Sequence, residues 1–335
     1  MRTHIRRAGT LFGLLLALPA AHAGSLMAGN DISVSGGFAG GYYRTSNIGV
    51  KDVDDYSVSD YLVNLSAESK DGSIGFTGAF GFLSQGTVFN GGVSHPTSAP
   101  SMDFQYGYVT VPTGGGVTFD AGMLATMIGY EVAPTFSNAN ILLGAVWNAQ
   151  PVYYTGVRAT YAANGFNVFA EANDDAALGG SKSAVFGVNG SAAGMNYVVN
   201  YGNGFNGKDI IDIIVSGTVA GVDAAVNLDY QKLDNQVGSL DDSAYGLALY
   251  ATVPVSEMVT VPVRVEYISD GTSGIYGGFD SGYTLTITPT YHASANTFVR
   301  GEVAYVTSDN NIFLDDAGAP TDNNTSFAVQ AGVTF

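Results

Sequence analysis

Apolar residues alternate with small or polar ones along much of this chain, and the last nine residues show the alternation most clearly. Phe327, Val329, Ala331, Val333 and Phe335 fall on one face of an extended segment, and the residues between them fall on the other. Successive side chains of a strand point to opposite faces of its sheet. The segment therefore predicts a β-strand with one apolar face and one face of small or polar side chains, ending on an aromatic residue.

The same period of two recurs in segments of about 10 to 13 residues, the length that a tilted strand needs to cross a membrane. The pattern predicts about sixteen strands, within a range of about 14 to 18, and about sixteen leave a barrel interior too wide for side chains alone to fill. The predicted strands are residues 30–44, 56–69, 72–84, 101–112, 116–127, 151–162, 165–175, 182–192, 194–204, 208–220, 222–234, 242–254, 258–270, 279–291, 295–308 and 323–335.

Short and long connections alternate between these segments. The short ones include residues 112–116, 162–165 and 192–194; the long ones are 45–55, 85–100, 128–150, 235–241, 271–278 and 309–322. Short periplasmic turns and long extracellular loops are typical of bacterial outer-membrane barrels, whereas a β-sandwich has no reason to sort its connections in this way. We therefore predict an all-β fold, a closed antiparallel transmembrane β-barrel, because closure leaves no strand edge in contact with lipid.

The first 23 residues have the pattern of a secretory signal peptide. Arg2, Arg6 and Arg7 form a basic region, residues 11–18 an apolar core, and Ala21-His-Ala23 a small-x-small cleavage site. The apolar core is shorter than the roughly 20 residues that span a bilayer. We expect removal of residues 1–23 and one outer-membrane barrel over residues 24–335. The terminal Phe335 resembles the signal that Gram-negative outer-membrane proteins present to the barrel assembly machinery.

Composition excludes several other functions. The formal net charge is −17, which argues against binding to nucleic acid phosphates. The chain has no cysteine, and only His95 and His292 follow the leader, so no metal cluster is expected. The glycine pattern at 202–207 precedes a strand-like run rather than a helix, so it does not predict a dinucleotide site. We predict no cofactor and no enzyme activity, because a hydrolase would depend on one of two isolated histidines.

The segment 117–161 resembles the β-barrel porin-2 family of outer-membrane proteins. The matching features are a strand that ends in Gly122, then Gly129-Tyr-Glu131, Asn138-Ala-Asn140, and a strand that Pro151 opens and that contains Gly156-Val157 and Tyr161. The chain departs from the family after Asn140, where an apolar run replaces the usual Ser and Arg. The resemblance covers about 45 residues in detail, and it implies an outer-membrane channel without a defined substrate.

Charged residues within the predicted strands fall on the face opposite the apolar one. Charge facing lipid is costly, so we expect these side chains to line the lumen: Asp60, Asp103, Asp120, Glu171, Asp212, Asp223, Asp229, Glu266, Glu302, Arg158, Arg264 and Arg300. Two interpretations remain open for Arg264 with Glu266 and for Arg300 with Glu302. The charges neutralise each other on the wall, or they produce a transverse field at a constriction.

The loop 128–150 is unusually apolar for an exposed segment, with Ile141, Leu142, Leu143, Val146 and Trp147 at roughly helical spacing. An exposed apolar face is unfavourable, so we expect the loop to fold into the lumen and pack on the inner wall. The alternative is packing on neighbouring loops or on a partner subunit. In the first case the candidate constriction residues that face water or hold the loop are Glu131, Asn138, Asn140, Arg158 and Arg300.

The sequence thus predicts an outer-membrane porin for passive diffusion of ions and small hydrophilic solutes. The alternative is a structural or adhesive barrel, or a scaffold for a secreted partner, without an open channel. The excess of acids predicts a preference for cations. The expected partners are membrane lipid, lipopolysaccharide and the assembly machinery, with a homotrimer carried over from sixteen-stranded porins. The solute, and whether the acidic loops bind divalent cations, stay open.

Overall fold

The computed structural model describes residues 32–48, 53–69, 73–89, 102–175, 181–234 and 241–335. Within these residues one antiparallel sheet forms the wall of the molecule. Its strands are β1 (Ile32–Thr45), β2 (Val53–Ala67), β3 (Gly75–Leu83), β4 (Asp103–Gly114), β5 (Val117–Ala125), β6 (Tyr153–Ala163), β7 (Phe166–Asp175), β8 (Ser181–Ala192), β9 (Met195–Phe205), β10 (Lys208–Val219), β11 (Val222–Leu233), β12 (Ser243–Pro254), β13 (Val259–Gly271), β14 (Asp280–Ile287), β15 (Thr290–His292), β16 (Thr297–Ser308) and β19 (Asn323–Thr334).

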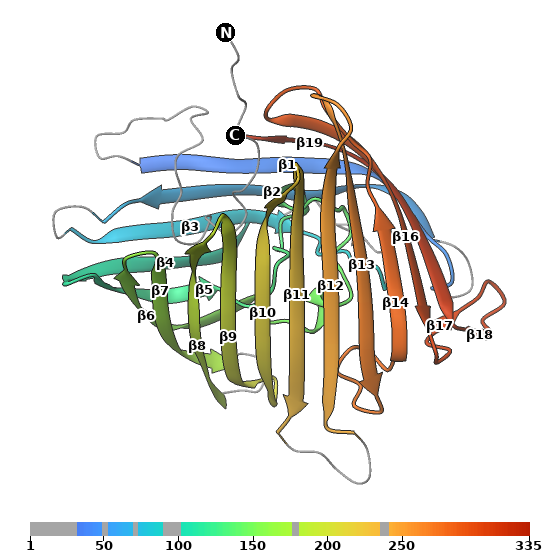
Figure 1. Cartoon of the computed structure of the whole chain (residues 1–335). Coiled ribbons are helices and arrows are strands. Elements are labelled where there is room, and N and C mark those ends of the chain that lie inside the picture. The colour runs from blue at the N-terminus through green and yellow to red at the C-terminus, as the bar shows by residue number, and fades with distance from the viewer. Residues whose placement is uncertain (1–31, 49–52, 70–72, 90–101, 176–180, 235–240) are drawn as a thin grey trace.

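The sheet closes on itself between its first and last strands (Figure 1). β1 pairs with β2 on one side and with β19 on the other. The terminal residue takes part, because the Phe335 N–H donates to the Gly36 carbonyl at 3.0 Å and the Gly36 N–H donates to the Phe335 carbonyl at 2.9 Å. The fold is therefore a closed antiparallel barrel, and the predicted fold class is confirmed.

The predicted number of sixteen strands is also confirmed, with one strand in two parts. β14 and β15 both pair with β13 and β16, so they occupy one place in the wall. They are separated at Pro289, which has no N–H to donate to the ladder. The Thr288 N–H donates to the Pro262 carbonyl at 2.9 Å, and the Pro289 carbonyl accepts from the Gly301 N–H at 3.0 Å, so neighbouring strands remain joined across the break.

The two faces of the wall differ as the alternation predicts. In β19, Phe327 is 45% and Val333 is 40% exposed on the outer face, whereas Gln330 is fully buried inside. Apolar side chains on the outside suit contact with lipid hydrocarbon, and aromatic pairs near the membrane surface are typical of such barrels. Two outward tyrosine pairs lie near the long-loop end with ring centroids 5.0 Å apart: Tyr230 with Tyr245, and Tyr267 with Tyr283.

Most connections sort by length as expected, and the clearest exception lies at the long-loop end. β9 and β10 are joined by only two residues, Asn206 and Gly207, with φ angles of 50° and 72°. Positive φ at both central residues is the geometry of a type I′ turn, which Asn-Gly favours. The 309–322 connection instead carries a small hairpin of its own, β17 (Phe313–Leu314) with β18 (Pro320–Thr321).

The expected leader, residues 1–23, lies outside the described residues, as do His95 and most of the 85–100 loop. In the part of the chain that the structure describes, no helix has the length and apolar character needed to cross a membrane.

Candidate functional site

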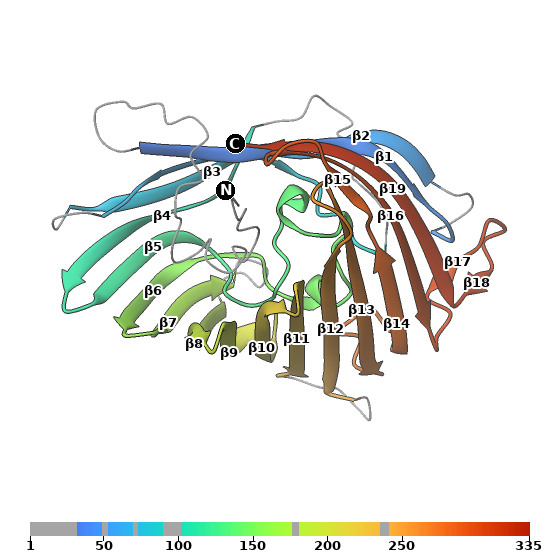
Figure 2. The same ribbon diagram turned by 45° about the horizontal axis from the view of Figure 1, so that its top comes forward.

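The connection between β5 and β6 folds into the barrel. Figure 2 shows this segment, residues 126–152, in green inside the ring of strands. We call it the interior loop. It contains two short 3-10 helices, η1 (Thr135–Ser137) and η2 (Trp147–Ala149). Its middle also meets the connection between β3 and β4, because the Leu143 N–H donates to the Gly86 carbonyl at 2.9 Å.

The apolar side chains of the interior loop lie against the inner wall. Leu142 and Val146 belong to a buried cluster that includes Ile268 of β13, and Ile141 packs with Tyr43 of β1. Burying an aliphatic side chain of this size contributes about 1.5–3 kcal/mol relative to exposure. The apolar run is therefore covered by wall strands that come from both ends of the chain, as the sequence led us to expect.

Five backbone N–H groups of the interior loop point into three carboxylates. An N–H that donates to a charged group contributes about 1.5–3 kcal/mol, more than one to a neutral group. Glu302 of β16 accepts from Ile141 at 2.5 Å and Leu142 at 2.9 Å, Glu131 accepts from Gly144 at 2.7 Å, and Glu266 of β13 accepts from Ala145 at 3.0 Å and Val146 at 2.9 Å.

Arg264 of β13 joins two of these carboxylates to the loop backbone. Its guanidinium forms a hydrogen-bonded ion pair with Glu131 and lies 3.3 Å from Glu266. It also donates to the Leu142 carbonyl at 2.8 Å and to the Thr286 hydroxyl at 3.1 Å. Because Arg264 is fully buried, its charge balances the carboxylates locally rather than facing the lumen. Arg264 is thus a structural link between wall and loop.

Arg300 of β16 holds the other part of the interior loop through backbone carbonyls. It donates to Asn138 at 2.7 Å and to Thr135 at 2.9 Å. Its Nε donates to Gln330 of β19 at 2.8 Å, and its guanidinium lies 4.8 Å from the centre of the Phe298 ring. The planar guanidinium with several fixed N–H groups suits this multiple contact.

The environment of Glu131 sets its protonation. Burial raises the pKa of Glu131 to about 7, the Arg264 guanidinium opposes that shift, and the neighbouring Glu266 carboxylate adds to it. Two carboxylates share one guanidinium here, so the positive charge does not fully compensate both. The loop contact through Glu131 is therefore sensitive to pH near neutrality.

Three predicted loop residues do not face water. Glu131, Asn138 and Asn140 are 6%, 7% and 2% exposed. The Asn138 side chain accepts from the Val132 N–H at 3.0 Å and donates to the Val132 carbonyl at 2.6 Å. The Asn140 side chain donates to the Thr288 hydroxyl at 2.7 Å. The expectation that these side chains face water was wrong. Their polar groups instead form hydrogen bonds with the loop backbone and with wall side chains that the loop covers.

Arg158 and Glu171 face inward but do not contact the acid of the loop. They form a buried ion pair across β6 and β7, and Arg158 also donates to the Ala125 carbonyl at the end of β5, at 2.9 Å. The ion pair that the loop carboxylate makes is with Arg264, on a strand far from Arg158 in the barrel. Arg158 therefore supports the start of the interior loop rather than its middle.

Asp103, Asp120 and Asp223 remain more accessible than the other predicted lumen residues. Asp103 is exposed at the start of β4, and Asp120 of β5 is half-buried. The Asp120 carboxylate accepts from the Thr110 hydroxyl at 2.6 Å, and its cross-strand partner is Arg158. These positions keep acidic groups on the inner side of the wall away from the carboxylates that hold the loop.

Sequence reasoning missed several groups that hold the ends of the interior loop. Lys208 donates from Nζ to the Ala149 carbonyl at 2.7 Å, and Gln150 donates to Asp229 at 2.8 Å. The Thr135 hydroxyl donates to the Asp60 carboxylate. The alternation along the strands predicted that the side chains of Asp60 and Asp229 point inward. Nothing in the sequence indicated which atoms of the loop they would contact.

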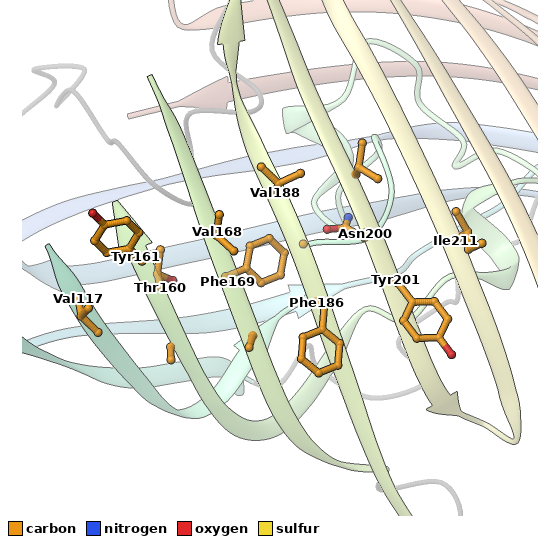
Figure 3. A pocket seen from close by; sticks show the side chains of 14 residues that line it. Val117, Thr160, Tyr161, Val168, Phe169, Phe186, Val188, Asn200, Tyr201 and Ile211 are labelled. Carbon is orange, nitrogen blue, oxygen red and sulfur yellow. The ribbon is translucent and has the colours of Figure 1, made fainter. Parts of the chain in front are cut away.

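No group of three or more His, Cys, Asp or Glu side chains among the described residues is placed to hold a metal ion. An apolar hollow lies elsewhere, on the outer side of β5–β10 (Figure 3). It encloses about 610 Å³ and is lined largely by exposed apolar residues such as Val168, Phe186 and Tyr201. Because these positions face outward, the hollow is part of the lipid-facing surface and not of the interior.

Solved structures with a similar fold are outer-membrane proteins. OmpT of Vibrio cholerae, folded in vitro, has a TM-score of 0.63 at 12% identity, over 91% of this chain and 97% of that one. An anion-selective porin from Comamonas acidovorans has a TM-score of 0.63 at 14% identity, over 91% and 100%. A mutant of Rh. blastica porin has a TM-score of 0.58 at 18% identity, over 91% and 100%. These likenesses show the fold.

A comparison with curated proteins finds no match. One protein family matches residues 62–335, and its description is "Putative beta-barrel porin-2, OmpL-like". The match spans most of the chain and includes the segment 117–161 that first suggested it. The family is one of porin-like outer-membrane barrels and not of enzymes. This chain belongs to the beta-barrel porin-2, OmpL-like family.

Proposed function

We propose that this protein is a porin, with a water-filled channel for the passive diffusion of ions and small hydrophilic solutes. The observation that carries the proposal is a closed sixteen-stranded barrel whose interior loop is held to the wall by buried charges. A barrel of this size is too wide for wall side chains alone to fill. The interior loop narrows the lumen and forms the constriction of the channel.

The preference for cations follows from which inward charges stay accessible. Arg158, Arg264 and Arg300 are 1%, 0% and 3% exposed, and each is bound to wall or loop groups. The inward acids Asp103, Asp120 and Asp223 are half-buried or exposed. An acidic lumen concentrates cations. The anion-selective Comamonas porin has a similar fold, so this preference depends on the side chains of this chain and not on the barrel.

A homotrimer is the proposed assembly. A trimer form of OmpT from Vibrio cholerae has a TM-score of 0.62 with this chain at 13% identity, over 91% of this chain and 99% of that one. The apolar outer face of the barrel is suited to contact with both lipid and a second subunit. Phe335, paired with Gly36 at the closing seam, is the proposed signal for the assembly machinery.

Planar bilayers provide the test. Purified protein is expected to give discrete conductance steps, and a panel of sugars, amino acids and organic acids in a liposome-swelling assay identifies the solutes that pass. Protein that inserts into the bilayer without any conductance would refute the channel. That result would favour the other candidate, a structural, adhesive or scaffolding barrel in which the interior loop seals the lumen.

A further inference from the structure

Asp212 and Asp229 form an unusual pair of carboxyl groups inside the barrel. They lie directly opposite each other on β10 and β11, and both are 0% exposed. The side-chain nitrogen of Asn227 donates to one carboxyl oxygen of each, at 2.7 and 3.1 Å, so the two carboxyl groups lie side by side. Two adjacent carboxylates in a site closed to water repel each other strongly if both are ionised, so we infer that one proton is held between them.

Among the described residues, no basic side chain forms an ion pair with either carboxyl group. Within the described residues Glu131, Glu171 and Glu266 each form an ion pair with an arginine, but Asp212 and Asp229 form none. Their remaining partners are neutral amides, as the side-chain nitrogens donate to the carboxyl oxygens at 2.7–3.1 Å: Asn200 and Asn227 to Asp212, and Asn227 and Gln150 to Asp229. The pair thus carries one negative charge in a site closed to water.

The same network reaches both ends of the interior loop. At the start of the loop, Asn200 donates to the Met127 carbonyl at 2.6 Å, and Asn227 accepts from the Tyr130 N–H at 3.2 Å. At the end of the loop, Gln150 bonds Asp229 and also donates to Asn227 at 3.1 Å. The network around the carboxyl pair therefore joins both ends of the loop to the wall.

We propose that the proton shared by Asp212 and Asp229 latches the base of the interior loop, and that its removal at alkaline pH releases the loop from β10 and β11. The regulatory role rests on the proposed channel function. Removal of the proton places two negative charges next to each other in a medium that screens them poorly. The two carboxylates move apart, and the side chains of Asn200 and Asn227, which bind them, lose their hydrogen bonds to the Met127–Tyr130 segment.

Other titratable groups lie near the pair and need separate control. Lys208 precedes Asp212 on β10 and interacts with Asp229 and Asp270, and Tyr276 lies close to Asp229. Glu131 follows the latched segment and bonds Gly144, at the middle of the loop. A change of Glu131 alone acts on that middle part and leaves the Asp212–Asp229 pair in place.

Hydrogen exchange of the backbone amides in residues 127–131 tests the latch without depending on conduction. After correction for the intrinsic pH dependence of exchange, the wild-type protein is expected to exchange at least tenfold faster at pH 9 than at pH 6. Asp212→Asn supplies a permanent N–H donor in place of the shared proton, so its corrected rate is expected to stay constant. Asp229→Asn is the second variant and is expected to behave alike. Glu131→Gln and the exposed Glu257→Gln are expected to keep the wild-type response.

Equal corrected rates at the two pH values in the wild-type protein would overturn the latch, and so would a wild-type response in Asp212→Asn and Asp229→Asn. If one of the two variants does not fold, the other variant together with the wild-type comparison still decides the matter. Bilayer conductance measured at both pH values separates the two proposals. If the protein does not conduct but its exchange depends on pH, the channel is refuted and the latch is supported. If the protein conducts but its exchange does not depend on pH, the channel is supported and the latch is refuted.

Discussion

The carboxylate of Glu302 is expected to protect two backbone amides of the interior loop from exchange with solvent. Its oxygens accept from Ile141 and Leu142, and one of them also accepts from the Thr288 hydroxyl at 2.7 Å. In the Glu302→Gln variant, the remaining side-chain carbonyl oxygen can still accept hydrogen bonds from the Ile141 N–H and the Thr288 hydroxyl. The amide nitrogen then faces the Leu142 N–H, so two donors meet without an acceptor.

The size of the effect follows from these contacts. A hydrogen bond to a charged group contributes about 1.5–3 kcal/mol and a neutral one about 0.5–1.5 kcal/mol. Glu302→Gln weakens the Ile141 bond and removes the Leu142 bond, for a total loss of about 3 kcal/mol. Because about 1.4 kcal/mol corresponds to a factor of ten, exchange of the Leu142 amide through local opening is expected to become about 100-fold faster.

Hydrogen exchange detected by mass spectrometry or NMR in detergent micelles measures this factor. Glu257→Gln removes a carboxylate from the exposed turn after β12, and it is the matched control with no expected change in the loop. The amides of β10 report whether the barrel as a whole is intact. An increase of less than about threefold at Leu142, with β10 unchanged, would refute the view that the carboxylate holds the loop.

Three further outcomes are expected. Reversal potentials in a KCl gradient are expected to show a preference for cations, which Asp120→Asn reduces; a preference for anions would refute the charge argument. Burial raises the pKa of Glu131 to about 7 from an ordinary value of 4.5, so the attached loop favours the protonated acid. The stabilisation from Glu131 is therefore full below pH 4.5 and is lost as pH rises through 7, and Glu131→Gln is expected to abolish this trend in the corrected exchange of Gly144. Native mass spectrometry in mild detergent is expected to show a trimer, and a strictly monomeric species would contradict that assembly.

The strands could be predicted from sequence because each carries its own signal. A strand in contact with lipid on one side must alternate, and the alternation of Phe327, Val329 and Val333 marks β19 without any knowledge of its neighbours. The inward parity of Arg264 and Glu302 follows from the same rule. Proline cannot donate to a strand ladder, so Pro289 was a possible point of interruption. The alternation on both sides of it nevertheless predicted one continuous strand.

The partners inside the barrel could not be predicted in the same way. Glu131 pairs with Arg264, 133 positions later in the chain, because the interior loop crosses the lumen from β5 to β13. No local pattern encodes that path. The sequence suggested Arg158, which follows the loop directly, and it suggested water around Asn138 and Asn140. The first inference used distance along the chain, and the second assumed that polar side chains of the loop point away from its apolar face. The apolar packing of Leu142 and Val146 decides where the loop lies.

Single-channel conductance of the wild-type protein and of a variant that lacks residues 136–146 tests most directly whether the interior loop forms the constriction. The deletion removes most of the apolar run and the N–H groups that the three carboxylates bind, while the wall strands stay complete. Discrete steps are expected in the wild-type protein, and steps severalfold larger in the deletion variant. Conductance that is unchanged by the deletion would contradict the proposed constriction, because it would place the narrowest part of the channel somewhere other than the interior loop.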